Sequence, residues 1–234
     1  MLFYLFFQKD IDIPDRIGYN NLCIISATVC RKCGTASLPA QTPAAELFKL
    51  RVITGIARGR KLVAPEGLDV RPTGDKVKEG IFSAIQFRLE GAYVLDLFAG
   101  SGQLGIEALS RGAERAVFVD SSLRSIRCVN ENLRNTKLDW RAEVINRDSY
   151  DYIKLTAKSF DIILLDPPYR HDHIANILPL CAKKLSKGGC IICEYEKEAQ
   201  EPSAPEGMSL RKIYHYGKIN VAIFDMPDEE VSDE

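Results

Sequence analysis

The feature that most constrains this sequence is a regular alternation of apolar runs and amphipathic segments between residues 93 and 195. The apolar runs predict strands at residues 93–97, 115–119, 142–146, 161–165 and 189–195. The periodic segments between them predict helices near residues 103–111, 123–135, 150–156 and 173–185. Strands that are apolar on both faces and separated by helices form a parallel sheet covered on both sides. We therefore expect an α/β fold with a doubly wound, mostly parallel sheet.

The two ends of this region complete the expected fold. Residues 210–216 and 219–225 predict two strands joined at Gly217 and Lys218, which would bring the sheet to seven strands with antiparallel pairing at its C-terminal edge. Residues 51–57 predict a short strand before the repeating pattern. A helix should follow it, with its apolar side chains on one face: Val77, Ile81, Phe82, Ile85 and Leu89.

Residues 1–50 differ from the rest of the chain. They show no helical or strand period, and residues 34–45 have the composition of a linker. We expect a poorly ordered extension, for which an overlong gene start is one explanation. The compact domain would then span residues 51–225, followed by an acidic tail at residues 226–234.

Composition excludes several classes of protein. With 46% hydrophobic and 27% charged residues, the chain is neither mainly disordered nor collagen-like. No apolar run reaches the roughly 20 residues that a membrane-spanning helix needs. The apolar residues 1–7 have no basic n-region and are too short for a secretory signal, and Asp10, Asp12 and Asp15 argue against an organelle transit peptide. We expect a cytoplasmic protein without membrane contact, acting as a monomer.

The seven cysteines do not indicate a disulfide framework or a metal site. Their number is odd and the chain shows no export signal, which favours reduced thiols. Cys190 and Cys193 lie three apart on a predicted strand, so their side chains should point to opposite faces of the sheet. Cys30 and Cys33 have metal-like spacing, but Cys23 is the only nearby third ligand. We expect no metal.

A glycine-rich loop follows the first strand of the alternating region. Residues 94–105 read VLDLFAGSGQLG, which predicts a strand, a tight turn and the start of a helix. Ligands of such folds bind at the carboxyl ends of the strands, on glycine backbone and helix N–H groups. The match to G-x-G-x-x-G keeps a nicotinamide dinucleotide among the candidates. However, Asp96 would repel a pyrophosphate, whereas it would attract the cationic methionyl end of S-adenosylmethionine.

Two further aspartates end the next strands. Asp120 lies 18 residues after Gly102, where it can accept hydrogen bonds from both ribose hydroxyls of either cofactor class. Asp148 follows the third strand and could accept from the adenine amino group, or it could cap the helix predicted from Tyr150.

The most specific motif is DPPY at residues 166–169, directly after an apolar strand. The two prolines fix the backbone and hold Asp166 at a rigid rim. There the carboxylate and a nearby carbonyl can grip the N–H groups of an exocyclic amine, and the carboxylate can stabilise the positive charge that develops on its nitrogen. Tyr169 could stack on a base drawn out of a helix. The motif predicts transfer of a methyl group to a planar amine.

These elements resemble a known family. Residues 94–102, Asp120, Asp148 and residues 166–169 resemble the ordered motifs of class I S-adenosylmethionine-dependent amino-methyltransferases. Two upstream blocks, RVITGIARGRKL at residues 51–62 and RPTGDKVKEGIF at residues 71–82, narrow the resemblance to bacterial small-subunit ribosomal RNA guanine-N2 methyltransferases. The resemblance covers roughly residues 51–224 and does not extend to residues 1–50.

The resemblance implies methyl transfer to the N2 amine of one guanine in assembled or assembling small-subunit RNA. It implies a methyltransferase domain at residues 51–225, with an RNA-binding and cofactor-closing segment at residues 51–90. The expected catalytic residues are Asp166, Pro167, Pro168 and Tyr169. The expected cofactor-binding residues are Asp96, Phe98, Ala99, Gly100, Ser101, Gly102, Asp120, Ser121, Asp148, Arg71 and Thr73, with Arg71 and Thr73 closing over the methionyl end. The expected RNA-binding residues are Arg58, Arg60 and Lys61, which lie in a stretch without acids.

Other functions remain open on the sequence alone. The DPPY motif also permits adenine N6 of DNA or a protein glutamine amide as the methyl acceptor. The absence of a separate DNA-recognition domain weakens the first alternative, and the basic residues Arg58, Arg60 and Lys61 weaken the second. A catalytically inactive nucleic-acid-binding module and a nicotinamide oxidoreductase are further alternatives. An intact Asp166 argues against the inactive module.

Overall fold

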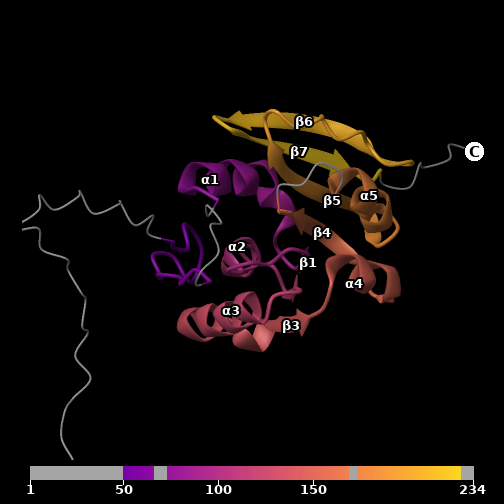
Figure 1. The fold of residues 1–234 in the computed structure, drawn as a ribbon. Helices are drawn as coiled ribbons and strands as arrows, with labels where there is room; N and C mark the ends of the chain where they lie inside the picture. Colours follow the sequence, from indigo (N-terminus) through magenta and orange to yellow (C-terminus); the bar gives the residue numbers. More distant parts are fainter. Residues whose placement is uncertain (1–49, 66–72, 169–172, 228–234) are drawn as a thin grey trace, which may run out of the picture. The chain divides into compact units, whose positions relative to one another are not determined.

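Seven strands form one mixed sheet in the order β3-β2-β1-β4-β5-β7-β6 (Figure 1). The computed structural model describes residues 50–65, 73–168 and 173–227, all within one compact unit. The strands are β1 (Tyr93–Asp96), β2 (Arg115–Asp120), β3 (Ala142–Asn146), β4 (Phe160–Leu165), β5 (Leu185–Glu196), β6 (Ser209–Tyr216) and β7 (Ile219–Asp225). β1 to β5 pair in parallel, and β7 lies antiparallel between β5 and β6. The predicted sheet and its antiparallel edge are confirmed.

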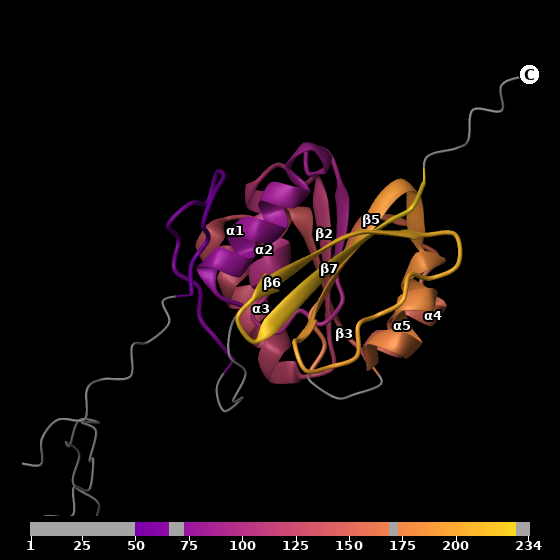
Figure 2. The same cartoon turned by 90° about the horizontal axis from the view of Figure 1, so that it is seen from above.

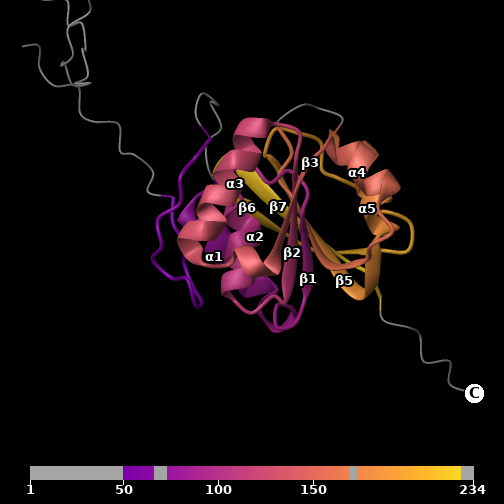
Figure 3. The same cartoon turned by 90° about the horizontal axis from the view of Figure 1, so that it is seen from below.

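Helices cover both faces of the sheet, as Figure 2 and Figure 3 show from opposite sides. The helices are α1 (Asp75–Ala84), α2 (Gln103–Ser110), α3 (Leu123–Thr136), α4 (Ser149–Leu155) and α5 (His173–Ala182), with short 3-10 turns at Gln86–Arg88 and Asp139–Arg141. α1, α2 and α3 pack on one face, where their apolar side chains join one buried cluster. α4 and α5 pack on the other face over a second cluster.

The alternation of side chains along the strands separates these two clusters. Cys190 belongs to the cluster beneath α1 to α3, whereas Cys193 belongs to the cluster beneath α4 and α5. The prediction that these thiols point to opposite faces is confirmed. Among the residues that the structure describes, no group of three or more histidine, cysteine or acidic side chains is placed to hold a metal ion. In the same part of the chain, no helix is long and apolar enough to cross a membrane.

The predicted strand at residues 51–57 is wrong. Only Arg51 pairs in an isolated bridge, with Lys61, and the chain then turns at Gly55, whose φ is +84°. The reason is that the backbone donors of this segment bind α2 instead of a strand: the Glu107 carboxylate accepts from the N–H groups of Ile53 at 2.7 Å and Thr54 at 2.9 Å. A side chain at Gly55 would overlap the carbonyl of Ser110 at the end of α2, so the turn also depends on glycine.

The helix predicted to carry Val77, Ile81, Phe82, Ile85 and Leu89 is shorter than expected. α1 ends at Ala84, and Ile85 and Leu89 lie beyond it around the first 3-10 turn. All five predicted apolar side chains are nevertheless buried. The apolar period therefore identified the buried residues correctly but not the end of the helix, because a 3-10 turn continues the same apolar face.

Candidate active site

A cavity of about 350 Å³ opens at the carboxyl ends of β1, β2 and β4, and we call it the first cavity. Most of the predicted cofactor and catalytic residues line it: Asp96, Phe98, Ala99, Gly100, Ser101, Asp120, Ser121, Asp148, Asp166, Pro167 and Pro168. This is the position where parallel α/β sheets bind ligands, because the loops that follow the strands converge there. The cavity volume is that of a small-molecule site.

Asp96, the last residue of β1, binds the start of the helix that follows the glycine loop. Its carboxylate is buried, with 2% exposure, and accepts a 2.9 Å hydrogen bond from the backbone N–H of Gly105 in the first turn of α2. A side chain at Gly105 would overlap the ring of Phe118, so α2 can pack this close to β2 only with glycine at this position. Burial raises the pKa of Asp96 to about 7, and the charges of Asp166 and Asp120 add to the effect. The carboxyl group beside the loop is therefore protonated in a substantial fraction of molecules near neutral pH.

Asp120 holds the same loop from the neighbouring strand. It ends β2, and its carboxylate accepts from the backbone N–H groups of Gly100 at 2.9 Å and Ser122 at 2.8 Å. Gly100 and Gly102 both have positive φ, which glycine adopts without strain. Gly102 itself is the residue before α2 and does not line the cavity.

Asp148 caps α4 and also lines the first cavity. Its Oδ1 accepts from the N–H groups of Tyr150 and Asp151, which is the geometry of a helix N-cap. The side chain is exposed, and no described residue donates to Oδ2. Capping and ligand binding are therefore compatible, because they use different oxygens.

Asp166 follows β4 and shares one donor with a second carboxylate. The hydroxyl of Thr73 lies 3.2 Å from Asp166 Oδ2 and 3.2 Å from Glu194 Oε2. Burial raises the pKa of Asp166 to about 6, although the bond from Thr73 opposes the shift. Burial and the charge of Asp166 raise the pKa of Glu194 well above its usual range. One hydroxyl hydrogen thus serves two carboxylates at the rim of the cavity.

Thr73 was predicted to contact the cofactor, yet it does not line the first cavity. It is buried, and the side-chain amide of Gln103, which does line the cavity, lies against its backbone: with the amide turned so that its oxygen faces Thr73, this oxygen accepts from Thr73 N–H at 3.0 Å. Two other predicted site residues, Arg71 and Tyr169, lie outside the described residues.

The basic stretch that includes Arg58, Arg60 and Lys61 forms a loop beside α2 and α3 (Figure 2). All three side chains are exposed, and no described acid pairs with them. Before the basic residues, Glu107 binds the backbone N–H of Ile53. After them, the side chain of Asn132 binds the backbone of Val63. Asn132 also donates to the carbonyl of Ser101 in the glycine loop at 2.8 Å. Buried contacts therefore place the basic loop close to the first cavity.

Sequence reasoning missed several residues of the site. Ala64, Pro65, Gln103, Leu104, Ser122, Ser125, Ser149, Tyr150 and His173 also line the first cavity. Glu194 was also missed. Cys193 of β5 pairs with Leu165 of β4, which puts Glu194 next to Asp166. The sequence shows only an acid near the end of an apolar strand, and the register that brings it beside Asp166 comes from the structure.

The lining of the first cavity fits S-adenosylmethionine better than a dinucleotide. Four carboxyl groups line it, from Asp96, Asp120, Asp148 and Asp166, and none of the described lining residues is lysine or arginine. Carboxylates attract the cationic amine and sulfonium and accept from ribose hydroxyls, whereas they repel the phosphates of a nicotinamide dinucleotide.

Comparisons with known proteins agree with this geometry. "Putative rRNA methyltransferase YlbH" of Bacillus subtilis is 40% identical over 180 residues, covering 75% of this chain and 98% of that protein. "Ribosomal RNA small subunit methyltransferase D" of Escherichia coli is 30% identical over 187 residues, covering 79% and 94%. The solved structure of "putative methyltransferase yhhF" from Escherichia coli superposes with a TM-score of 0.69 at 31% identity, covering 76% of this chain and 98% of that one.

The resemblance inferred from the motifs is therefore confirmed. A model of the family described as Conserved hypothetical protein 95 matches residues 50–225, which include every strand and helix described above. The chain belongs to the Conserved hypothetical protein 95 family.

Proposed function

We propose that this protein transfers a methyl group from S-adenosylmethionine to the exocyclic N2 amine of a guanine in small-subunit ribosomal RNA. The observation that carries the proposal is the position of Asp166: it directly follows β4, lines a carboxylate-rich cavity and is followed by two prolines. Family membership supports the coarser activity of a ribosomal RNA methyltransferase, because the relatives bear that name. The choice of guanine N2 as the methyl acceptor is our own further proposal.

The first cavity would hold the cofactor. Asp120 and Asp148 would accept hydrogen bonds from the ribose hydroxyls and the adenine amine, and the backbone of Gly100 and Ser101 would lie against the nucleoside. Asp96 would face the methionyl end, where a positive charge would lower its pKa and restore the carboxylate. The cofactor supplies a methyl group bound to a positively charged sulfur.

Asp166 would accept from the N2 amine and fix its orientation. The lone pair of this amine is delocalised into the ring, so the amine is a poor nucleophile, and positive charge appears on nitrogen as the new bond forms. A carboxylate held by its backbone is aimed at that charge before the reaction begins and stabilises it when it develops. Alignment of nitrogen, methyl carbon and sulfur supplies much of the remaining acceleration.

The basic loop would contact RNA phosphates. Arg58, Arg60 and Lys61 present three exposed cations without described acidic partners, next to the first cavity. Such cations position RNA without reading its sequence. This role supports a polyanionic substrate over the amide of a protein.

Nucleoside analysis tests the proposal. Small ribosomal subunits and naked small-subunit RNA from a strain lacking this gene are incubated with the protein and labelled S-adenosylmethionine, and the RNA is digested to nucleosides. The proposal predicts label in N2-methylguanosine. Label in N6-methyladenosine, or in protein and not in RNA, would assign a different acceptor.

A further inference from the structure

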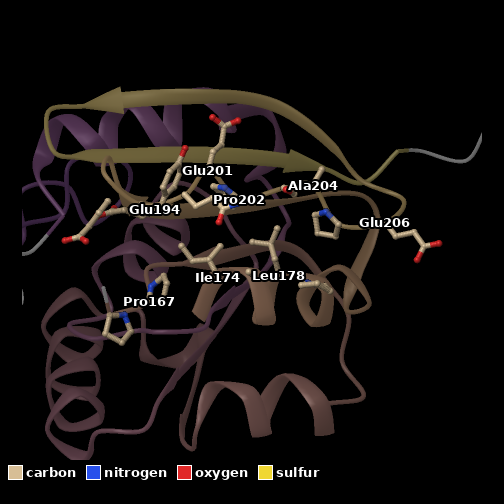
Figure 4. A pocket seen from close by; sticks show the side chains of 17 residues that line it. Pro167, Ile174, Leu178, Glu194, Glu201, Pro202, Ala204 and Glu206 are labelled. Carbon is tan, nitrogen blue, oxygen red and sulfur yellow. The ribbon is translucent and has the colours of Figure 1, made fainter. Parts of the chain in front are cut away.

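A second cavity, of about 410 Å³, lies on the other side of the two prolines. Pro167 and Pro168 line both cavities, so a ligand in either one touches the same rim. In Figure 4, Ile174 and Leu178 rise from α5 toward Pro202 and Ala204 across this second cavity. Apolar side chains thus form part of its walls, as the flat faces of a nucleobase require.

Carboxylates form the largest group of polar side chains in the second cavity, beside Gln200, Ser203 and Tyr195. Four glutamates line it: Glu194, Glu196, Glu201 and Glu206. None of the described residues that line it is lysine, arginine or histidine. A phosphate would be repelled, whereas a neutral ligand edge rich in N–H donors would be bound.

Glu194 is the buried member of this set, with 2% exposure. Its Oε2 accepts from the Thr73 hydroxyl, and no described residue donates to its Oε1. The same hydroxyl serves Asp166, so the two carboxylates share a single hydroxyl donor among the described residues. A buried carboxylate oxygen without a donor is costly, and a ligand that brings N–H groups would remove that cost.

We propose that the target guanine lies in the second cavity against the shared rim of Pro167 and Pro168, that Glu194 accepts from its N1–H group, and that its N2 amine extends across this rim to Asp166, which lines the first cavity. This inference rests on the proposed function and names the residue that selects the base. The β4–β5 register supports it, because Glu194 and Asp166 follow paired residues at the same edge of the sheet. Guanine carries N1–H and the N2 amine side by side. Adenine and cytosine present a ring nitrogen acceptor where guanine has N1–H, and Glu194 would repel that lone pair.

Base analogues test this role. Small-subunit RNA fragments are prepared with guanine, 2-aminopurine or 2,6-diaminopurine at the methylated position. Both analogues keep the amine at C2 but have an acceptor at N1. We expect kcat/KM of the protein to be about tenfold to more than a hundredfold lower for the analogues, which corresponds to the loss of a hydrogen bond to a charged group.

Glu194→Gln is the matched variant, since it keeps the size of the side chain and supplies an amide N–H that can face an acceptor. It should lower the ratio of kcat/KM for guanine over 2,6-diaminopurine at least tenfold. Glu198→Gln, at an exposed glutamate that lines neither cavity, should leave the ratio unchanged. Calorimetric binding of S-adenosylmethionine and thermal unfolding establish that the variants are folded.

The outcomes separate the two proposals. If the unaltered protein methylates no guanine RNA, the proposed function fails. If it methylates guanine RNA but accepts the analogues equally well, or if Glu194→Gln leaves the ratio unchanged, the base-selecting role of Glu194 is overturned. If Glu194→Gln does not fold, the unaltered protein still tests the role of Glu194. A higher kcat/KM for guanine than for 2-aminopurine supports it, and equal values overturn it.

Discussion

The carboxylate of Asp120 accepts a 2.9 Å hydrogen bond from the backbone N–H of Gly100, so the residue that ends β2 also holds the turn that follows β1. The two strands are neighbours in the sheet, and the bond ties their carboxyl ends together. Asp120 is thus expected to act twice, as a ligand of the ribose and as a support of the glycine loop.

Asp120→Ala should weaken S-adenosylmethionine binding by tenfold to more than a hundredfold, because hydrogen bonds to a charged group contribute roughly 1.5–3 kcal/mol each. Asp120→Asn, which keeps one acceptor for Gly100, should lose less. Calorimetric titration measures both affinities, with the exposed Glu114→Gln as control. Unchanged affinity in Asp120→Ala would show that this carboxylate does not contact the cofactor.

Asp96 should make the stability of the protein depend on pH. Its pKa is raised from 3.8 to about 7 by burial, so the unfolded chain releases this proton at lower pH than the folded protein does. The contribution of Asp96 to the free energy of unfolding therefore falls as pH rises from about 4 to about 7 and is constant above that.

Asp96→Asn removes this titration and keeps an oxygen for the N–H of Gly105. Relative to the unaltered protein, the variant should gain stability with rising pH, up to about 4 kcal/mol between pH 4 and pH 7. Urea unfolding at several pH values in the absence of cofactor measures the difference. A difference that does not change with pH would show that Asp96 titrates normally.

Replacing Arg58, Arg60 and Lys61 together by glutamine should weaken RNA binding and leave cofactor affinity intact. Loss of three phosphate contacts should reduce the slope of log K against log salt concentration by roughly two to three units. Lys154, Lys183 and Lys218 are exposed elsewhere and form the matched control when replaced together. Equal slopes for the two triple variants would place the RNA contacts outside the basic loop.

The sheet and its helices could be predicted because local patterns encode them. Apolar runs that bury both faces, as at Ile162 to Leu165, have few alternatives to a central parallel strand. Asp120 and Asp166 could be located in the cavity because the carboxyl ends of parallel strands converge at one edge.

The errors arose where distant residues decide the local conformation. Residues 51–57 have the composition of a strand, but Glu107 and Ser110, more than 50 positions away, bind their backbone N–H groups. The hydroxyl of Thr73 and the carboxylate of Glu194 meet across 121 positions, and no local pattern reports that contact. Glu194 was accessible only through the register of β4 and β5, which the sequence alone does not determine.

The pH dependence of the reaction should follow Asp166. Burial raises its pKa to about 6, and only the ionised form stabilises positive charge on the amine. The rate at saturating substrate should therefore rise with pH through about 6 and then level off, if RNA and cofactor leave this pKa in place. Asp166→Asn should be slower and should lack this rising limb. An identical pH profile in Asp166→Asn would assign the limb to another group.

The rate of N2-methylguanosine formation by Asp166→Ala, at saturating S-adenosylmethionine, tests the central claim most directly. The account predicts normal folding, near-normal cofactor affinity and a rate lowered about a hundredfold to a thousandfold, the effect of removing a preorganised group that stabilises developing charge. A rate close to that of the unaltered protein would contradict it, because Asp166 would then have no part in methyl transfer.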